Sequence, residues 1–134
     1  MPFLLDTNVA IHLRDRVDWV MDRVEALGNE ILISVVTRVE LEGGVHAQPL
    51  HSAVRRERLD AMLASLPTAP FDDAAADAYR SIVEAPGFSR RKVLDRMIAA
   101  QALVLRATLV TLNGEDFRDV PGLALLAWQR GKPT

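Results

Sequence analysis

The chain has 134 residues, of which 49% are hydrophobic and 25% are charged, and its formal net charge is −2. These values are typical of one globular domain over residues 1–134 that buries a core without crosslinks, and they exclude nucleic-acid binding through bulk positive charge. The absence of cysteine excludes disulfides and thiolate metal sites and suits a cytoplasmic location. No apolar run approaches the roughly 20 residues of a membrane span, and the start MPFLLDTN lacks the basic region of a signal peptide, so we expect no membrane contact.

The first half of the chain alternates short apolar runs with helical patterns. The runs at 3–5 and 30–34 are predicted strands, because they are short, continuous and apolar. Gly28, the pair Gly43-Gly44 and Pro67 are expected to end three of the helices. Apolar residues at helical spacing predict these helices at 8–14, 18–27, 37–45 and 52–66.

The second half repeats the alternation. A short strand is expected at 69–71, and an Ala-rich helix at 73–83 should end before Pro86-Gly87. A strongly helical segment at 93–106 leads into predicted strands at 107–111 and 123–126. Strands separated by helices indicate an α/β fold with a mostly parallel sheet.

Four acidic residues share one placement relative to these elements. Asp6, Glu40 and Asp116 each come just past a predicted strand, and Asp95 begins the long helix. In parallel α/β sheets, ligands bind outside the carboxyl ends of the strands. Helix N-termini also gather there, and their partial positive charge favours carboxylates. The four acids are therefore candidates for a common site.

Each acid also has an ordinary structural explanation. Asp6 fits a helix cap, and the segment TRVE fits a capping box in which Thr37 is the cap and Glu40 reaches back. Asp95 would complement a helix dipole, and Asp116 would end an ordinary turn. Four caps at one edge of a small sheet, however, would repel each other by a few kcal/mol at separations of ~4 Å. Such a cluster requires a cation or raised pKa values, and all-carboxylate ligands suit Mg²⁺, with Mn²⁺ as the other option.

Four motifs occur in an order and spacing that resemble a known family. They are LLDTNV at 4–9, ISVVTRVELEGG at 33–44, LDRMIAAQAL at 94–103 and LVTLNGEDFRDVPGLAL at 109–125. The chain resembles the PIN-domain ribonucleases, and most closely the VapC-type toxins of bacterial type II toxin–antitoxin systems. The likeness covers nearly the whole chain and implies a three-layer α/β/α sandwich with a short, mostly parallel sheet.

The resemblance implies a Mg²⁺-dependent endoribonuclease whose catalytic residues correspond to Asp6, Glu40, Asp95 and Asp116. Asp6, Asp95 and Asp116 are expected to bind the metal, and Glu40 is either a further ligand or the base that activates water. One or two ions held there would lower the pKa of bound water and stabilise charge on the leaving oxygen. Asn8, Thr111 and Asn113 match family positions that support the acids.

Basic residues near two of the acids are candidates for binding RNA. Arg90, Arg91 and Lys92 stand three to five residues before the third acid, and Arg38 stands near the second. A solvated basic turn explains the trio equally well. The segment SRRKV also departs from the family, in which glycine often leads into the third acid. The two tryptophans are expected to pack in the core, so no aromatic ladder for single-stranded bases is evident.

The resemblance also implies partners. They are an RNA substrate, a cognate antitoxin and a second copy of the chain, which would give a homodimer and a toxin–antitoxin hetero-oligomer. Two other enzyme classes fit less well, because an aspartyl phosphatase needs an acid where Asn8 stands, and a receiver domain needs a late lysine partner. The alternative within the family is an inactive PIN fold that binds RNA or protein without cutting.

Overall fold

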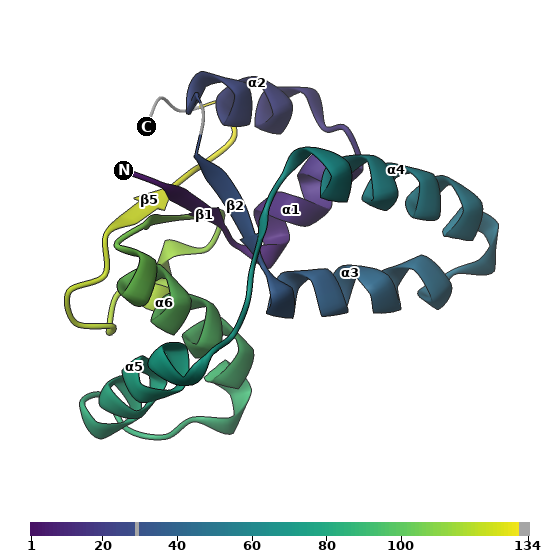
Figure 1. The fold of residues 1–134 in the computed structure, drawn as a ribbon. Coiled ribbons are helices and arrows are strands. Elements are labelled where there is room, and N and C mark those ends of the chain that lie inside the picture. Colours follow the sequence, from purple (N-terminus) through teal and green to yellow (C-terminus); the bar gives the residue numbers. More distant parts are fainter. Residues whose placement is uncertain (29, 132–134) are drawn as a thin grey trace.

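The computed structural model describes residues 1–28 and 30–131. Its strands alternate with helices along the chain, as expected (Figure 1). The elements are β1 (Phe3–Leu5), α1 (Thr7–Arg14), α2 (Asp18–Ala26), β2 (Ile31–Ser34), α3 (Val35–Ala47), α4 (Ser52–Ser65), β3 (Thr68–Ala69), α5 (Asp73–Glu84), α6 (Val93–Leu105), β4 (Thr108–Thr111) and β5 (Leu125–Ala127). Three 3₁₀ helices join them, η1 (Pro49–His51), η2 (Arg90–Lys92) and η3 (Gly114–Phe117).

The sheet has five strands in the order β3-β2-β1-β4-β5, and every pairing is parallel. The central strand β1 pairs Leu4 with Leu32 on one side and with Leu109 on the other. Because all strands point the same way, their carboxyl ends meet at one edge of the sheet. This confirms the expected α/β class, and it places the residues that follow β1, β2 and β4 next to each other.

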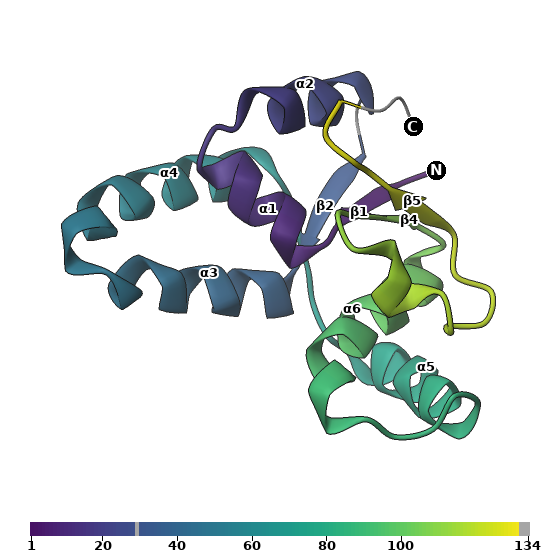
Figure 2. The same cartoon turned by 180° about the vertical axis from the view of Figure 1, so that it is seen from behind.

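Helices cover both faces of the sheet (Figures 1 and 2). Side chains alternate between the faces along each strand, so Leu5 packs with residues of α1 to α4, whereas Leu4 packs with residues of α5 and α6. Two buried clusters result, one on each side of the sheet. The structure is therefore a three-layer α/β/α sandwich. None of its described helices is long and apolar enough to cross a membrane.

The helix α3 differs from its prediction at both ends. It begins at Val35 instead of 37, because the Ser34 hydroxyl accepts a hydrogen bond from the Val36 backbone N–H at 2.9 Å and caps it. The predicted capping box with Thr37 as the cap is therefore wrong. The helix also continues through Gly43-Gly44 to Ala47.

Tertiary contacts explain why the two glycines do not end α3. A side chain at Gly44 would approach the Arg14 guanidinium to 3.4 Å, so α1 packs closely on the helix there. The Gly44 carbonyl also accepts a hydrogen bond of 2.8 Å from Arg55 on α4. Helix propensity is a weak preference that such packing overrides.

The strand predictions at 69–71 and 123–126 are correct in place and wrong in extent. The pairing of Ile33 with Thr68 and of Ser34 with Ala69 begins β3 one residue earlier and limits it to two residues. The pairing of Leu109 with Leu125 sets β5 two residues later than its predicted start. The register with a neighbouring strand decides these boundaries, and this register cannot be read from the local sequence.

Candidate active site

Asp6 lies at the carboxyl end of the central strand and is the N-cap of α1. Its Oδ1 accepts a hydrogen bond of 2.8 Å from the backbone N–H of Thr7, as the capping explanation predicted. Its Oδ2 accepts a second bond of 2.7 Å from the hydroxyl of Thr111, the last residue of β4. Only 4% of Asp6 is exposed. Two adjacent strands and one helix therefore fix the orientation of this carboxylate.

The environment of Asp6 favours its protonated form. Burial raises the pKa of the carboxyl from 3.8 to about 6, although the hydrogen bonds from Thr111 and Thr7 act in the opposite direction. The negative charges of Asp95 and Glu40 raise the pKa further. Two hydrogen bonds thus do not compensate the burial of this charge, and a bound cation would stabilise its ionised form.

Glu40 stands exposed on α3 and does not reach back to cap that helix. Its Oε1 accepts a hydrogen bond of 2.9 Å from the Thr7 hydroxyl. The same hydroxyl lies 2.9 Å from that of Thr37, which is fully buried. Thr7 therefore joins the cap of α1 to the second acid. The sequence prediction did not include Thr7, and it gave Thr37 a capping role. The available signal for Thr37 was its spacing, because a residue three positions before Glu40 lies on the same face of the helix.

Asp95 lies half-buried in the first turn of α6, as expected. Burial raises the pKa of its carboxyl, and the charges of Asp116 and Glu40 add to this effect. The positive charges of Lys92 and Arg91 act against it. Asp95 is therefore close enough to two other acids, and to two of the predicted RNA-binding residues, to respond to their charge.

Asp116 lies in η3, just beyond β4. Its Oδ2 accepts a hydrogen bond of 2.6 Å from the Asn113 side chain. The Asn113 backbone N–H donates in turn to the Thr111 hydroxyl at 3.0 Å, and Asn8 accepts a bond of 3.2 Å from the Leu112 N–H. The three residues predicted to support the site thus all contact an acid or the end of β4.

The four acids are gathered at one edge of the sheet without forming a closed ligand set. Asp6 responds to the charges of Asp95 and Glu40, and Asp95 responds to that of Asp116. Among the residues that the structure describes, however, no three His, Asp or Glu side chains lie close enough to hold a metal ion as they stand. The donors are carboxylate oxygens, with amide and hydroxyl groups beside them, which is the chemistry that Mg²⁺ or Mn²⁺ prefers.

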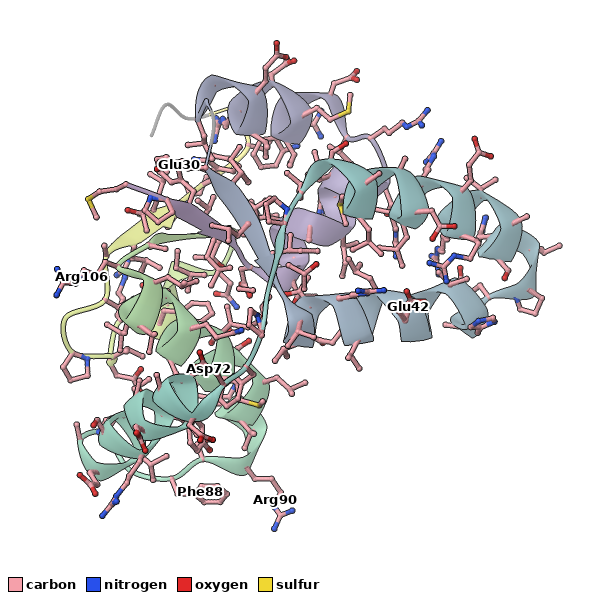
Figure 3. The ribbon with its side chains drawn as sticks, in the orientation of Figure 1. Glu30, Glu42, Asp72, Phe88, Arg90 and Arg106 are labelled. Carbon is pink, nitrogen blue, oxygen red and sulfur yellow. The ribbon has the colours of Figure 1, made fainter. Side chains whose placement is uncertain are left out.

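The basic candidates occupy two different places. Arg90 and Arg91 are exposed in η2, whereas the Lys92 ammonium lies 3.5 Å from the Asp119 carboxylate. Arg38 lies near Glu42, whose pKa is lowered first by a hydrogen bond from Arg56 and then also by the Arg38 charge. Glu42 is on the side of α3 that faces α4 (Figure 3). Of the four basic candidates, Lys92 and Arg91 thus have a charge effect on Asp95, and Arg38 has one on Glu42.

Two buried polar residues on α6, which the prediction did not include, hold the surroundings of the site. Arg96 is 3% exposed, donates to the Gly87 carbonyl, and lies 3.1 Å from the Asp119 carboxylate. Gln101 accepts from the Ser34 hydroxyl and donates to the carbonyls of residues 69 and 70 at 3.0 and 2.9 Å. The available signal was the presence of these two polar residues in an otherwise apolar helix. The sequence did not show their partners, most of which are more than 20 residues away.

The fold and the acids together define a class, namely α/β proteins that carry an acidic site at the carboxyl edge of a parallel sheet. Within that class, the family model described as the PIN domain matches residues 3–123. The chain belongs to the PIN domain family, as the resemblance indicated.

Curated and solved proteins extend this similarity over nearly the whole chain. Ribonuclease VapC2 from Rickettsia felis is 29% identical over 136 residues, which cover 97% of this chain and 100% of that protein. The structure of VapBC2 from Rickettsia felis, bound to a DNA fragment from its promoter, matches with a TM-score of 0.84 and 29% identity, over 96% of this chain and 100% of that one. FitAcB from Neisseria gonorrhoeae matches with a TM-score of 0.79 and 26% identity, over 92% and 96% of the two chains.

Proposed function

We propose that this protein is a Mg²⁺-dependent endoribonuclease that acts as the toxin of a toxin–antitoxin module. The observation that carries the proposal is the buried Asp6, held at the carboxyl edge of the sheet with its pKa raised to about 6 and within range of two further acids. The similarity to a protein named as a ribonuclease, and to complexes named VapBC, supports the same function.

In this proposal, Asp6, Asp95 and Asp116 hold Mg²⁺, or Mn²⁺ in its place. The bound ion would lower the pKa of a water molecule and neutralise charge on the phosphodiester. The hydrogen bonds from Thr7 and Thr111 keep both Asp6 oxygens in a fixed orientation. Hydrogen bonds of this kind orient the side chains that bind a metal ion.

Glu40 has two possible roles in the same reaction. The Thr7 hydroxyl donates to its Oε1, and the side chain is exposed to solvent. The carboxylate would take the proton of the attacking water or bind the ion. The Asn113 amide, which donates to the Asp116 carboxylate, would keep that carboxylate in a fixed orientation.

The test of the enzyme is RNA cleavage by the purified protein under matched conditions. We expect cleavage with Mg²⁺, none with EDTA, and none with the Asp6→Asn variant. Asp77→Asn is the control, because Asp77 is exposed on α5. Equal cleavage in all samples would reveal a contaminating nuclease and leave the proposal without support.

The test of the toxin role is expression in bacteria without a partner. We expect growth to stop, and the Asp6→Ala variant to restore it. Normal growth of cells that contain the full-length, folded protein would contradict the toxin role, although not the family assignment.

We further propose that the chain binds a cognate antitoxin and a second copy of itself. A similar structure, 26% identical to this chain, is a member of the VapBC family of toxin–antitoxin systems, which supports an antitoxin partner. Co-expression with the product of a small neighbouring reading frame, followed by light scattering on the purified complex, measures both stoichiometries. A monomer that purifies without the second product would contradict this proposal.

An inactive PIN fold that binds RNA or protein is the second candidate function. The observation in its favour is that no three described acids lie close enough to hold an ion as they stand. The cleavage assay separates the two candidates, since only the enzyme requires both Mg²⁺ and Asp6.

A further inference from the structure

Phe88 is an aromatic side chain that the fold leaves in solvent. It is 65% exposed, whereas the other six aromatic residues of the chain, all within the described parts, are buried or half-buried. Figure 3 shows Phe88 and Arg90 projecting outward from the segment between α5 and α6. Single exposed apolar side chains are common on protein surfaces, so the exposure of Phe88 points to a ligand only together with its anchored position and the cations beside it.

The segment that carries Phe88 is held in place. The buried Arg96 donates to the Gly87 carbonyl, and the Lys92 backbone N–H donates to the Ser89 carbonyl at 3.2 Å. Gly87 has a φ of +97°, a conformation that favours glycine and turns the chain immediately before Phe88. The exposure of Phe88 therefore follows from an anchored turn and not from a loose end.

Positive charge continues from Phe88 toward the acidic site. Arg90, Arg91 and Lys92 follow it in η2, and α6 begins at the next residue. The charges of Arg91 and Lys92 act on Asp95. Phe88, the three cations, of which Lys92 also pairs with Asp119 at 3.5 Å, and Asp95 thus lie within eight consecutive residues, and we call residues 88–92 the Phe88–Lys92 rim.

We propose that the Phe88–Lys92 rim binds single-stranded RNA beside the cleavage site, with Phe88 stacked on a nucleobase. The proposal rests on the proposed ribonuclease function and adds a base-binding residue to it. Arginine and lysine contact phosphates, which positions the strand without reading its sequence. An aromatic side chain accepts the face of any base, so stacking adds affinity with little sequence preference.

RNA is favoured over a protein partner because of charge. Residues 88–92 carry three basic side chains and no acid, so their charge complements the phosphates of RNA, whereas a protein surface matches such dense positive charge only where acids cluster. The same combination suits a single strand, whose phosphates and bases alternate along the chain.

The test measures RNA binding without cleavage, in the Asp6→Asn protein with EDTA. The probes are fluorescein-labelled oligo(A) and oligo(U) of about 12 nucleotides, long enough for a site of ordinary size. Phe88→Ala should raise Kd by about fivefold or more for both probes, and Phe88→Trp should restore the affinity. The loss should be larger for oligo(A), because purines stack more strongly.

Salt dependence distinguishes the aromatic residue from its basic neighbours. Phe88→Ala should leave the slope of log Kd against log salt unchanged, whereas Arg90→Ala and Arg91→Ala should each reduce it by about 0.7 if they contact one phosphate. Leu50→Ala is the control, because Leu50 is 94% exposed in η1 and outside the rim. It should change neither Kd nor slope.

Three results would overturn the proposal. Unchanged RNA affinity in Phe88→Ala would do so directly. Unchanged affinity together with a smaller assembly in light scattering would assign Phe88 to a protein contact. Binding of neither probe by any variant would remove the rim as an RNA site, while the cleavage assay above would still decide the ribonuclease function separately.

Discussion

Asp6 shows how a single residue carries both a structural and a chemical role. Its cap of α1 and its bond to Thr111 would satisfy a carboxylate near the surface. At 4% exposure, however, burial outweighs both bonds and raises the pKa of the carboxyl to about 6. At neutral pH the Asp6 carboxyl is therefore ionised in a protein environment that favours its neutral form.

Asp6→Asn should stabilise the metal-free protein in a pH-dependent way. The folded-state pKa, about 6, exceeds the ordinary 3.8, so stability falls as pH rises between these values and stays reduced above the higher one. At 1.36 kcal/mol per pKa unit, the ionised carboxylate costs the folded state about 2–3 kcal/mol. The variant should melt several degrees above the parent near pH 8 and no higher than the parent near pH 3.5.

Calorimetry of both proteins at several pH values, with EDTA present, measures this difference. Asp77→Asn serves again as the exposed control and should shift melting little at either pH. If the difference in melting temperature between the parent and Asp6→Asn did not vary with pH, the burial of the Asp6 charge would not be its cause.

Thr7→Val should lower activity more than stability. The substitution keeps the shape and removes the hydroxyl that holds Glu40 and contacts Thr37. Loss of one such bond is worth about 1 kcal/mol, so cleavage should fall by about fivefold if the bond acts in the transition state. Thr7→Ser keeps the hydroxyl and should retain activity, and equal losses in the two variants would refute this role for the hydroxyl.

At the scale of elements, the site is assembled by the ends of several of them. α1 begins at Thr7, α3 brings Glu40, α6 brings Asp95 in its first turn, and η3 brings Asp116. Gln101 links three segments near the site, because its side chain bonds Ser34 before α3 and two carbonyls at the end of β3. The position of each acid thus depends on packing between elements.

Gly114→Ala should disturb the element that carries Asp116. A Cβ at Gly114 would lie 2.9 Å from that of Ala127 in β5, so η3 or the strand must shift. Overpacking of this kind costs about 1–3 kcal/mol, and we expect lower cleavage because Asp116 is two residues away.

The matched control is Gly43→Ala, where an added Cβ would meet nothing within 4 Å. Because Gly43 is helical, this variant should be more stable by about 0.5–1 kcal/mol and fully active. Urea unfolding and the cleavage assay measure both effects. Equal stability and equal cleavage in the two variants would show that the contact between Gly114 and Ala127 does not constrain η3.

At the scale of the whole molecule, the parallel sheet collects negative charge at one edge. The pKa values of Asp6 and Asp95 are both raised, first by burial and then by charges on other acids of the site. A divalent cation would relieve this repulsion, so folding and metal binding should be coupled.

Mg²⁺ or Mn²⁺ should therefore raise the melting temperature, and more so near pH 8 than near pH 5. The acids compete with protons at the lower pH, because the pKa of Asp6 is about 6. An ion at ten times its Kd should add about 1.4 kcal/mol to the free energy of unfolding. Asp6→Asn should lose most of this gain, and an equal gain in parent and variant would indicate ion binding elsewhere.

The site shows how far sequence reasoning extends. The acids at strand ends and at the start of α6 were visible, because they follow short apolar runs or open a periodic segment. The partners of those acids were not visible. Thr111 bonds Asp6 across 105 residues, and Thr7 bonds Glu40 across 33, so each contact exists only when separate elements are packed.

By itself, the sequence determined the alternation of strands and helices, the α/β class and the choice of acids, because apolar periodicity and strand length are local properties of the chain. The tertiary structure alone decided that Ser34 rather than Thr37 caps α3, that the helix passes through Gly43-Gly44, and that Phe88 stays in solvent. These outcomes depend on strand register, close helix packing and bonds between distant residues. No local pattern encodes such contacts, because their free energy arises only when the whole chain is folded.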